Sequence, residues 1–222
     1  MVTNEVLNTI LSRKGVKQYK SNPVPRELLE AIVAAGIAAP NAFNRQAWHF
    51  SVITNKTLLE EIDAETNHRL GDEEGYHSLY GAPVLIVISS ARDNNFAKQD
   101  CSAANENMAL AAKSLGLASR YLDVPNLYTN TPEGAGCKEM CGIPKDYDTV
   151  CFLCLGYSDD ISEQPTPKRG DVVNYVDEGK EDQDHAEDCY QRDQRGGGTH
   201  GCPPADPCRG RGAGVPRGVD FF

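Results

Sequence analysis

The stretch Pro-Val-Leu-Ile-Val-Ile-Ser-Ser at positions 83–90 decides the fold, because it is short, apolar and rich in β-branched residues. Such a run predicts a buried strand. Residues 48–54 and 149–156 have the same character and predict two more strands. Apolar residues at three- and four-residue spacing predict a helix over 25–40, and an alanine-rich segment predicts a buried helix over 103–115. Strands separated by helices indicate an α/β or α+β sandwich.

The composition limits what the chain can be. Its 222 residues include 22 lysines and arginines against 32 aspartates and glutamates, for a net charge of −10, and 40% are hydrophobic, which is enough for a core. The acidic balance excludes a surface that binds nucleic acid or anionic membrane throughout. No apolar run approaches the roughly 20 residues that span a bilayer, and the first residues lack the regions of a signal peptide. We therefore expect a cytoplasmic protein without nucleic-acid or membrane partners.

The chain divides into two unlike parts near Asp177. The last leucine is Leu155 and the last isoleucine is Ile161, whereas residues 178–222 hold nine of the 20 glycines, four of the 13 prolines and three of the eight cysteines. A segment of this composition cannot bury enough apolar surface to offset its ordering entropy. We expect a folded domain over residues 1–177 and a disordered tail over 178–222. Out-of-frame translation of GC-rich DNA is an alternative origin for that tail.

Three polar segments are candidate binding sites. Ser-Arg-Lys-Gly-Val-Lys at 12–17 places three cations beside a glycine, which suits a phosphate but also a solvated helix end. The amide-rich loop within 39–50 offers donors and acceptors for the edge of a heteroaromatic ring, or is a helix-to-strand turn. Pro-Lys-Arg at 167–169 is a basic pair or ordinary surface charge. Neither a Rossmann glycine fingerprint nor a P-loop is present, so nucleotide binding needs another device.

The order of these segments resembles one known family. Arg-Lys-Gly-Val-Lys at 13–17, Ala-Pro-Asn at 39–41 and Gln-Ala-Trp-His-Phe at 46–50 are followed by Tyr-Gly-Ala-Pro-Val at 80–84. Leu-Gly-Leu-Ala-Ser at 115–119 and Pro-Lys-Arg at 167–169 come after them. Over about residues 6–176, this succession resembles the nitroreductase-like FMN-dependent oxidoreductase family.

The resemblance implies a fold, an assembly and a binding site. The fold is an α+β, three-layer sandwich in which helices flank a central mixed, mainly antiparallel sheet, and the assembly is a homodimer with flavin sites at its interface. One group of residues would line the FMN phosphate, ribityl chain and pyrimidine edge: Arg13, Lys14, Gly15, Lys17, Lys168 and Arg169. A second group would reach the partner subunit's flavin or lie near the ring: Pro40, Asn41, Asn44, Asn67, Leu117 and Ala118.

The implied chemistry belongs to the cofactor, so no catalytic side chain is expected. NADH or NADPH would reduce FMN and leave, and a small-molecule acceptor such as a nitroaromatic or a quinone would take its place. Lys17 or Arg13 could stabilise the anionic reduced flavin. The chain departs from the family at Gly15, where serine is usual, and at Arg120 and Tyr121, which replace a turn that is often apolar.

The sequence is also compatible with other functions. They are a non-catalytic flavin- or metal-binding redox protein, and a reductive dehalogenase or flavin-fragmenting relative of the same fold. Cys151 and Cys154 lie in an apolar strand, where residues three apart point to opposite faces, so we interpret them as buried hydrophobic residues. Cys137 and Cys141 flank a glycine-rich loop and are either reactive or merely exposed. The His and Cys spacing of the tail fits no common zinc motif, so we expect no metal.

Overall fold

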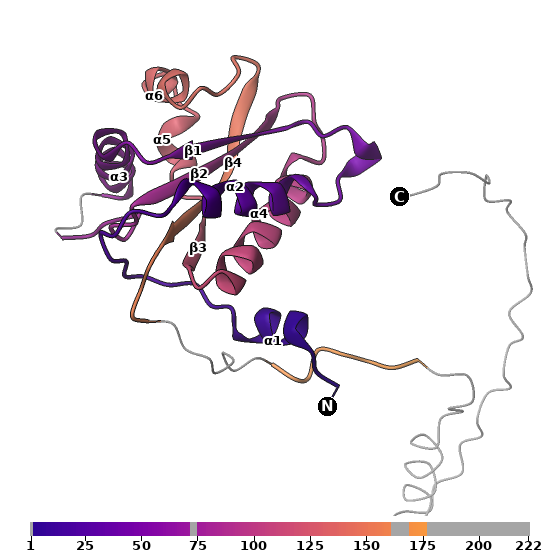
Figure 1. The fold of residues 1–222 in the computed structure, drawn as a ribbon. Coiled ribbons are helices and arrows are strands. Elements are labelled where there is room, and N and C mark those ends of the chain that lie inside the picture. Colours follow the sequence, from indigo (N-terminus) through magenta and orange to yellow (C-terminus); the bar gives the residue numbers. More distant parts are fainter. Residues whose placement is uncertain (1, 72–74, 161–168, 177–222) are drawn as a thin grey trace, which may run out of the picture. The chain divides into compact units, whose positions relative to one another are not determined.

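The computed structural model of the protein describes residues 2–71, 75–160 and 169–176 (Figure 1). The described chain divides into two compact units, and residues up to 160 belong to the first. In chain order the elements of this first unit are α1 (Glu5–Ser12), α2 (Arg26–Ile37), the 3-10 turn η1 (Ala42–Asn44), β1 (Trp48–Ile53), α3 (Lys56–Leu70), β2 (Val84–Ala91), α4 (Ala97–Ser114), β3 (Ala118–Leu122), α5 (Asn126–Thr129), α6 (Ala135–Met140) and β4 (Tyr147–Gly156).

The sheet has four strands in the order β1-β2-β4-β3, and every neighbouring pair is antiparallel. The apolar stretch at 83–90 forms most of β2. Residues Val84 to Ser90 of this strand are all buried because it lies in the middle of the sheet. The one parallel pairing among the described residues is an isolated bridge between Gly15 and Ser119, beside β3. The expected α+β class with a mainly antiparallel sheet is confirmed.

Helices cover both faces of the sheet, as Figure 1 shows. On one face, α2 and α4 pack against a core that includes Ile32, Met108 and Leu153. On the other face, α3, α5 and α6 enclose a second core that includes Ile62 and Phe152. Because side chains alternate along a strand, β4 serves both cores at once. The expected three-layer arrangement is therefore present.

The cysteines of β4 follow this alternation. Cys151 lies in the core under α2 and α4, and Cys154 lies in the opposite core, both without exposed surface. Their expected role as buried hydrophobic residues is confirmed. Cys137 lies on α6 and Cys141 ends that helix, and both are buried, so the alternative that they are merely exposed is wrong. The reason is that α6 turns its cysteines toward the core under α3.

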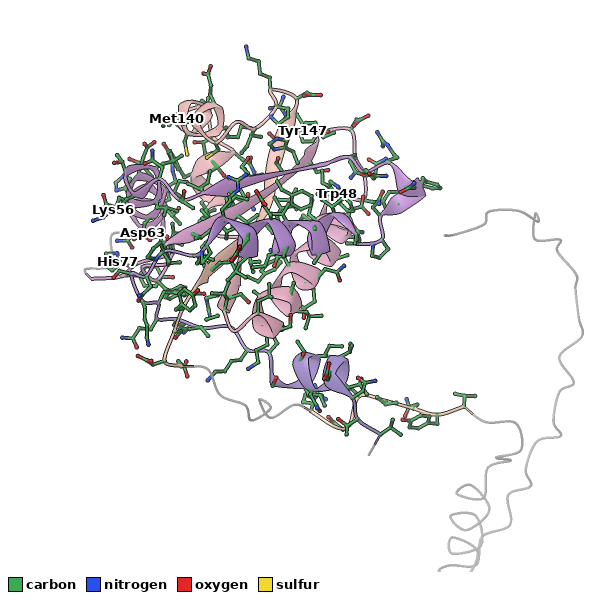
Figure 2. The ribbon with its side chains drawn as sticks, viewed as in Figure 1. Trp48, Lys56, Asp63, His77, Met140 and Tyr147 are labelled. Carbon is green, nitrogen blue, oxygen red and sulfur yellow. The ribbon has the colours of Figure 1, made fainter. Side chains whose placement is uncertain are left out.

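Helix α3 and strand β3 were not expected from the sequence, and neither were the short helices α5 and α6. Helix α3 is capped at its start by Asn55, whose side chain accepts from the Leu58 amide, and it ends at Gly71 with a φ of 106°. From the middle of that helix, Asp63 faces His77, with 2.8 Å between the carboxylate and Nδ1 (Figure 2). Strand β3 contains Arg120 and Tyr121, so the expected turn at this place is wrong. Hydrogen bonding to β4 extends the backbone there.

The second unit is described only over residues 169–176, which are exposed. Residues 178–222 lie outside the described residues, so the domain boundary at Asp177 stays a prediction. Within the described part of the chain, no helix combines the length and apolar character that a membrane span requires.

Candidate functional site

The basic segment 13–17 lies along the edge of the sheet. Helix α1 ends at Ser12, and the chain then runs beside β3, where the Val16 amide donates to the Ser119 carbonyl at 3.1 Å. Val16 is buried, whereas Gly15 and Lys17 are exposed. Because β3 is an edge strand, its outer carbonyl groups are free to hold this extra segment. The sheet therefore fixes the backbone of the predicted phosphate-binding residues.

Four of the predicted site residues meet at one place. Arg13 and Lys14 line a small hollow together with Leu117 and Ala118, which follow the glycine turn after α4. Arg13 is paired with Glu106 of α4 at 2.9 Å, and Lys14 is paired with an aspartate after β4 at 2.6 Å. Each of these carboxylates is at least half exposed, so an anion with better geometry can compete with it.

A third cation lies beside Gly15. The Arg120 guanidinium lies over the Tyr80 ring, 4.7 Å from its centroid, and its Nε is buried with no hydrogen-bond partner. The hydroxyl of Tyr19 is also buried without a partner. Burial raises the pKa of Tyr19 above its ordinary value, a shift that the nearby charge of Arg120 opposes. Buried polar atoms are nearly always hydrogen-bonded, so this place has the character of a ligand site. The sequence had marked Arg120 only as a departure from the family.

The amide-rich loop has an unusual backbone. Phe43, Asn44 and Gln46 all have positive φ values, between 48° and 55°. The loop is held by Asn41, whose Oδ1 accepts from the Gln46 amide at 2.8 Å, and by Asp100, whose carboxylate accepts from the Ala42 amide at 2.9 Å. Positive φ is costly for residues with a side chain and is often found at functional sites.

The loop does not line the hollow beside the basic segment. The loop is tied to Asp100 in the first turn of α4, whereas the hollow beside Arg13 includes Lys113 in the last turn. Those two positions are about 20 Å apart along a helix that rises about 1.5 Å per residue. Arg13 reaches Glu106, which lies about 9 Å along that helix from Asp100, and Pro40, Asn41 and Asn44 do not line the hollow in their own chain.

Of the remaining predicted residues of the first unit, Gly15, Lys17 and Asn67 do not line the hollow. Asn67 is half-buried on α3. Lys168 lies outside the described residues. Arg169 belongs to the second unit, where it forms a two-pronged ion pair with Asp171. Lys17 is exposed at the end of the basic segment 13–17.

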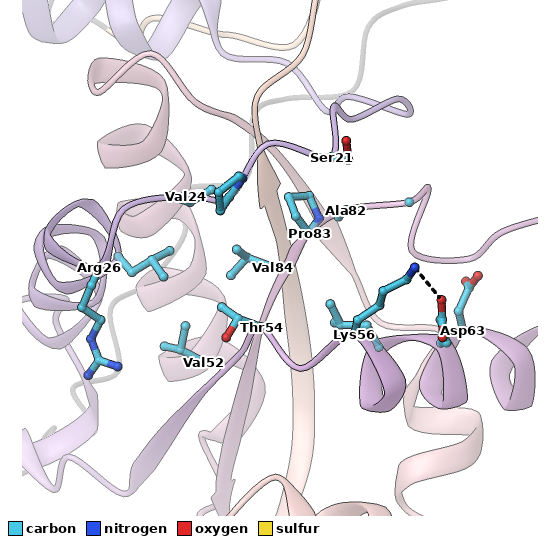
Figure 3. Close-up of a pocket in the computed structure, with 15 residues that line it drawn as sticks. Ser21, Val24, Arg26, Val52, Thr54, Lys56, Asp63, Ala82, Pro83 and Val84 are labelled. Carbon is cyan, nitrogen blue, oxygen red and sulfur yellow. Dashed lines mark ion pairs between the residues drawn. The ribbon is translucent and has the colours of Figure 1, made fainter.

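A larger cavity, of about 610 Å³, opens between α2 and α3 at the β1 edge of the sheet (Figure 3). Its centre is apolar, with Val24, Pro83 and Val84, and Arg26 and Lys56 lie on its two sides. Lys56 is paired with Glu60 of α3 at 3.6 Å. This cavity could not be predicted from the sequence, because the valines that line it have the same pattern as core residues.

These features define a three-layer α+β protein with a cation-lined site at the free edge of its sheet. The chain matches the Nitroreductase family over residues 10–157 and belongs to that family. This confirms the expected class, an oxidoreductase of the nitroreductase type.

Relatives agree with this assignment. The chain is 32% identical to a putative NADH dehydrogenase/NAD(P)H nitroreductase of Archaeoglobus fulgidus over 70% of this chain and 87% of that one. It is also 32% identical to a protein of the same description from Methanothermobacter thermautotrophicus, over 47% of this chain, and the match spans only 53% of that protein. A nitroreductase of Bacteroides fragilis, solved with bound FMN, superposes with a TM-score of 0.73 at 30% identity, covering 79% of this chain and all of that one.

Proposed function

We propose that the protein is an FMN-dependent oxidoreductase that takes electrons from NADH or NADPH and passes them to a nitroaromatic, a quinone or a related small acceptor. The observation that carries the proposal is that Arg13, Lys14, Leu117 and Ala118 come together at the edge of the sheet. The chain belongs to the Nitroreductase family, and the similar nitroreductase of B. fragilis was solved with bound FMN. The names of the A. fulgidus and M. thermautotrophicus relatives support the nicotinamide donor.

The residues present fit an anionic flavin. Arg13 and Lys14 supply positive charge, and the backbone of Gly15 is exposed, so its atoms are open to a phosphate. Arg120 Nε and the Tyr19 hydroxyl lack partners and can donate to a bound group. Lys168 and Arg169 are proposed to complete the phosphate contacts. When bound, FMN supplies the two-electron chemistry through N5 of its ring.

The protein's own part is to bind, orient and stabilise charge. Lys17 or Arg13 would hold a positive charge near the pyrimidine edge and favour the electron-rich form of the cofactor. Leu117 and Ala118 are buried and would give the ring an apolar surface. Asn67 would offer an amide at the flavin edge. We propose no catalytic acid, base or nucleophile.

The working unit is proposed to be a homodimer. Pro40, Asn41 and Asn44 do not line the hollow beside Arg13 and Lys14 in their own chain, and they would serve the site of the partner subunit. Helix α1 exposes Val6, Ile10 and several neighbouring apolar side chains, and the loop exposes 62% of Phe43. Exposed apolar surface of this kind is typical of protein interfaces.

The test is reconstitution followed by an acceptor screen. The purified chain is incubated with FMN, freed of unbound flavin, and examined by absorbance. NAD(P)H oxidation is then measured with and without menadione or a nitrobenzene. The proposal expects a flavin spectrum and an oxidation rate that rises with acceptor. Failure to retain FMN would refute it, whereas bound FMN without acceptor-dependent turnover would favour the non-catalytic redox protein.

A further inference from the structure

Arg120 occupies an unusual position for a charged residue. It lies in the middle of β3 opposite Cys154, and its neighbour on the same face, Leu122, belongs to the core under α3. Arginine side chains normally extend to water from such positions. Here the side chain instead turns back over Tyr80 and the Nε is buried.

The space for this arginine exists because residue 15 is glycine. A Cβ on Gly15 would lie 3.3 Å from Arg120 Nη1 and 3.8 Å from its Cγ. The first distance is tighter than most real contacts, so a larger residue at position 15 would push the guanidinium away. Arg120 therefore lies directly against the backbone of the basic segment.

Arg120 does not line the hollow, and it differs from Arg13 and Lys14 in what it contacts. Arg13 and Lys14 each have a carboxylate partner. No carboxylate of the described residues lies within salt-bridge distance of Arg120, and its Nε has no acceptor. The Tyr19 hydroxyl close to it is unpartnered as well. A partly buried cation with an unused donor, beside a second unused donor, calls for an anionic acceptor.

We propose that Arg120 is an anion-binding residue of the flavin site and contacts the phosphate group of FMN across Gly15. This inference rests on the proposed function, because the anion is the phosphate of the proposed cofactor. The guanidinium would add a charge-assisted hydrogen bond to a phosphate oxygen. Arg120 would thus favour FMN over riboflavin, which has no phosphate.

The experiment compares the binding of FMN and riboflavin by quenching of flavin fluorescence. The variants are Arg120→Met, which removes the charge and keeps the stem, and Arg120→Lys, which keeps the charge. Arg69→Met is the matched control, because Arg69 also lies over a tyrosine, Tyr128, at 5.6 Å. It therefore reproduces the loss of a cation–aromatic contact elsewhere in the unit. Thermal melting of each variant reports whether it is folded.

The proposal expects Arg120→Met to bind FMN about tenfold more weakly while its riboflavin affinity stays the same, as one charged hydrogen bond predicts. Arg120→Lys would lie between it and the wild type, and Arg69→Met would match the wild type. Equal FMN affinity in Arg120→Met, or an equal loss for both flavins, would overturn the proposal. If Arg120→Met does not fold, the FMN and riboflavin affinities are compared in Arg120→Gln instead. A wild-type protein that binds neither flavin would refute the proposed function instead.

Discussion

At the scale of single residues, the cysteines show how environment determines reactivity. Burial raises the pKa of Cys151 to about 11, and it also raises the pKa of Cys154, which lies in the opposite core. A thiol with a raised pKa stays protonated at neutral pH, and the thiolate is the nucleophile. Both cysteines therefore act as hydrophobic residues that fill the two sides of β4.

We expect iodoacetamide at pH 7.5 to leave Cys151 and Cys154 unmodified in the native protein and to modify both in 6 M guanidinium chloride. Peptide mass spectrometry resolves the two sites, because each modified peptide gains the mass of one carbamidomethyl group. The denatured sample is the control for intrinsic reactivity. Native labelling of Cys154 at the rate seen in denaturant would contradict the burial on which the fold of β4 is based.

At the scale of elements, the packing of α2 on α4 depends on Gly36. A Cβ at this position would meet Met108 Cγ at 2.8 Å and Sδ at 2.9 Å, and Met108 is fully buried. Gly36→Ala should destabilise the protein by about 1–2 kcal/mol, because overpacking costs about 1–3 kcal/mol and a better helix propensity returns up to about 1. Urea unfolding measures the change.

The matched control for Gly36→Ala is Gly136→Ala. Gly136 lies in helix α6, and a Cβ there would meet nothing within 4 Å. This substitution should be neutral or slightly stabilising, since only the helix propensity changes. A Gly36→Ala protein as stable as the control would mean that α2 and α4 are less closely packed than the Met108 distances indicate.

A second prediction at the scale of elements concerns Asp148, which lies at the start of β4 and accepts hydrogen bonds from Arg92 and Lys138. Partial burial would raise its pKa, but hydrogen bonds from Arg92 and Lys138 outweigh this and lower the pKa below the ordinary value. A lowered carboxyl pKa stabilises the fold above the unfolded-state pKa, near 4, and this contribution is lost as the pH falls through the folded pKa. The melting temperatures of wild type and Asp148→Asn should therefore differ at pH 6 and converge near pH 3. A constant difference across that range would refute the linkage.

The elements also show what the sequence could and could not predict. Helix α2 and strands β1, β2 and β4 were predictable because their apolar patterns are strong, and Pro25, Pro83 and Gly156 also mark boundaries of α2, β2 and β4. Helix α3 has buried residues at three- and four-residue spacing, but its many charged residues weaken the signal. Strand β3 is five residues long and contains Arg120 and Tyr121, so only pairing with β4 identifies it.

The same limit applies to the site. Arg13, Lys14, Leu117 and Ala118 could be grouped from the family resemblance, and the sheet edge brings them together. The contact between Gly15 and Arg120 could not be predicted, because it depends on how one arginine side chain turns back across a strand. A sequence records that both residues are present, whereas their contact follows from the register of β3 and the segment beside it.

At the scale of the whole molecule, the last prediction concerns the domain boundary near Asp177. The family match ends at residue 157, and residues 178–222 contain no leucine or isoleucine that could extend either core. A chain ending at Asp177 should therefore keep the melting temperature, FMN affinity and acceptor-dependent NAD(P)H oxidation of the full chain. Differential scanning fluorimetry, flavin quenching and steady-state kinetics measure these three properties.

The double variant Lys168→Ala/Arg169→Ala, made in the chain that ends at Asp177, is the informative comparison. If these two residues complete the phosphate site, its FMN affinity should fall at least tenfold, since hydrogen bonds between charged groups each contribute about 1.5–3 kcal/mol. Its riboflavin affinity should not change. Loss of FMN binding on removing residues 178–222 alone would place part of the site in the tail. It would also contradict the division of the chain that its leucines and isoleucines indicate.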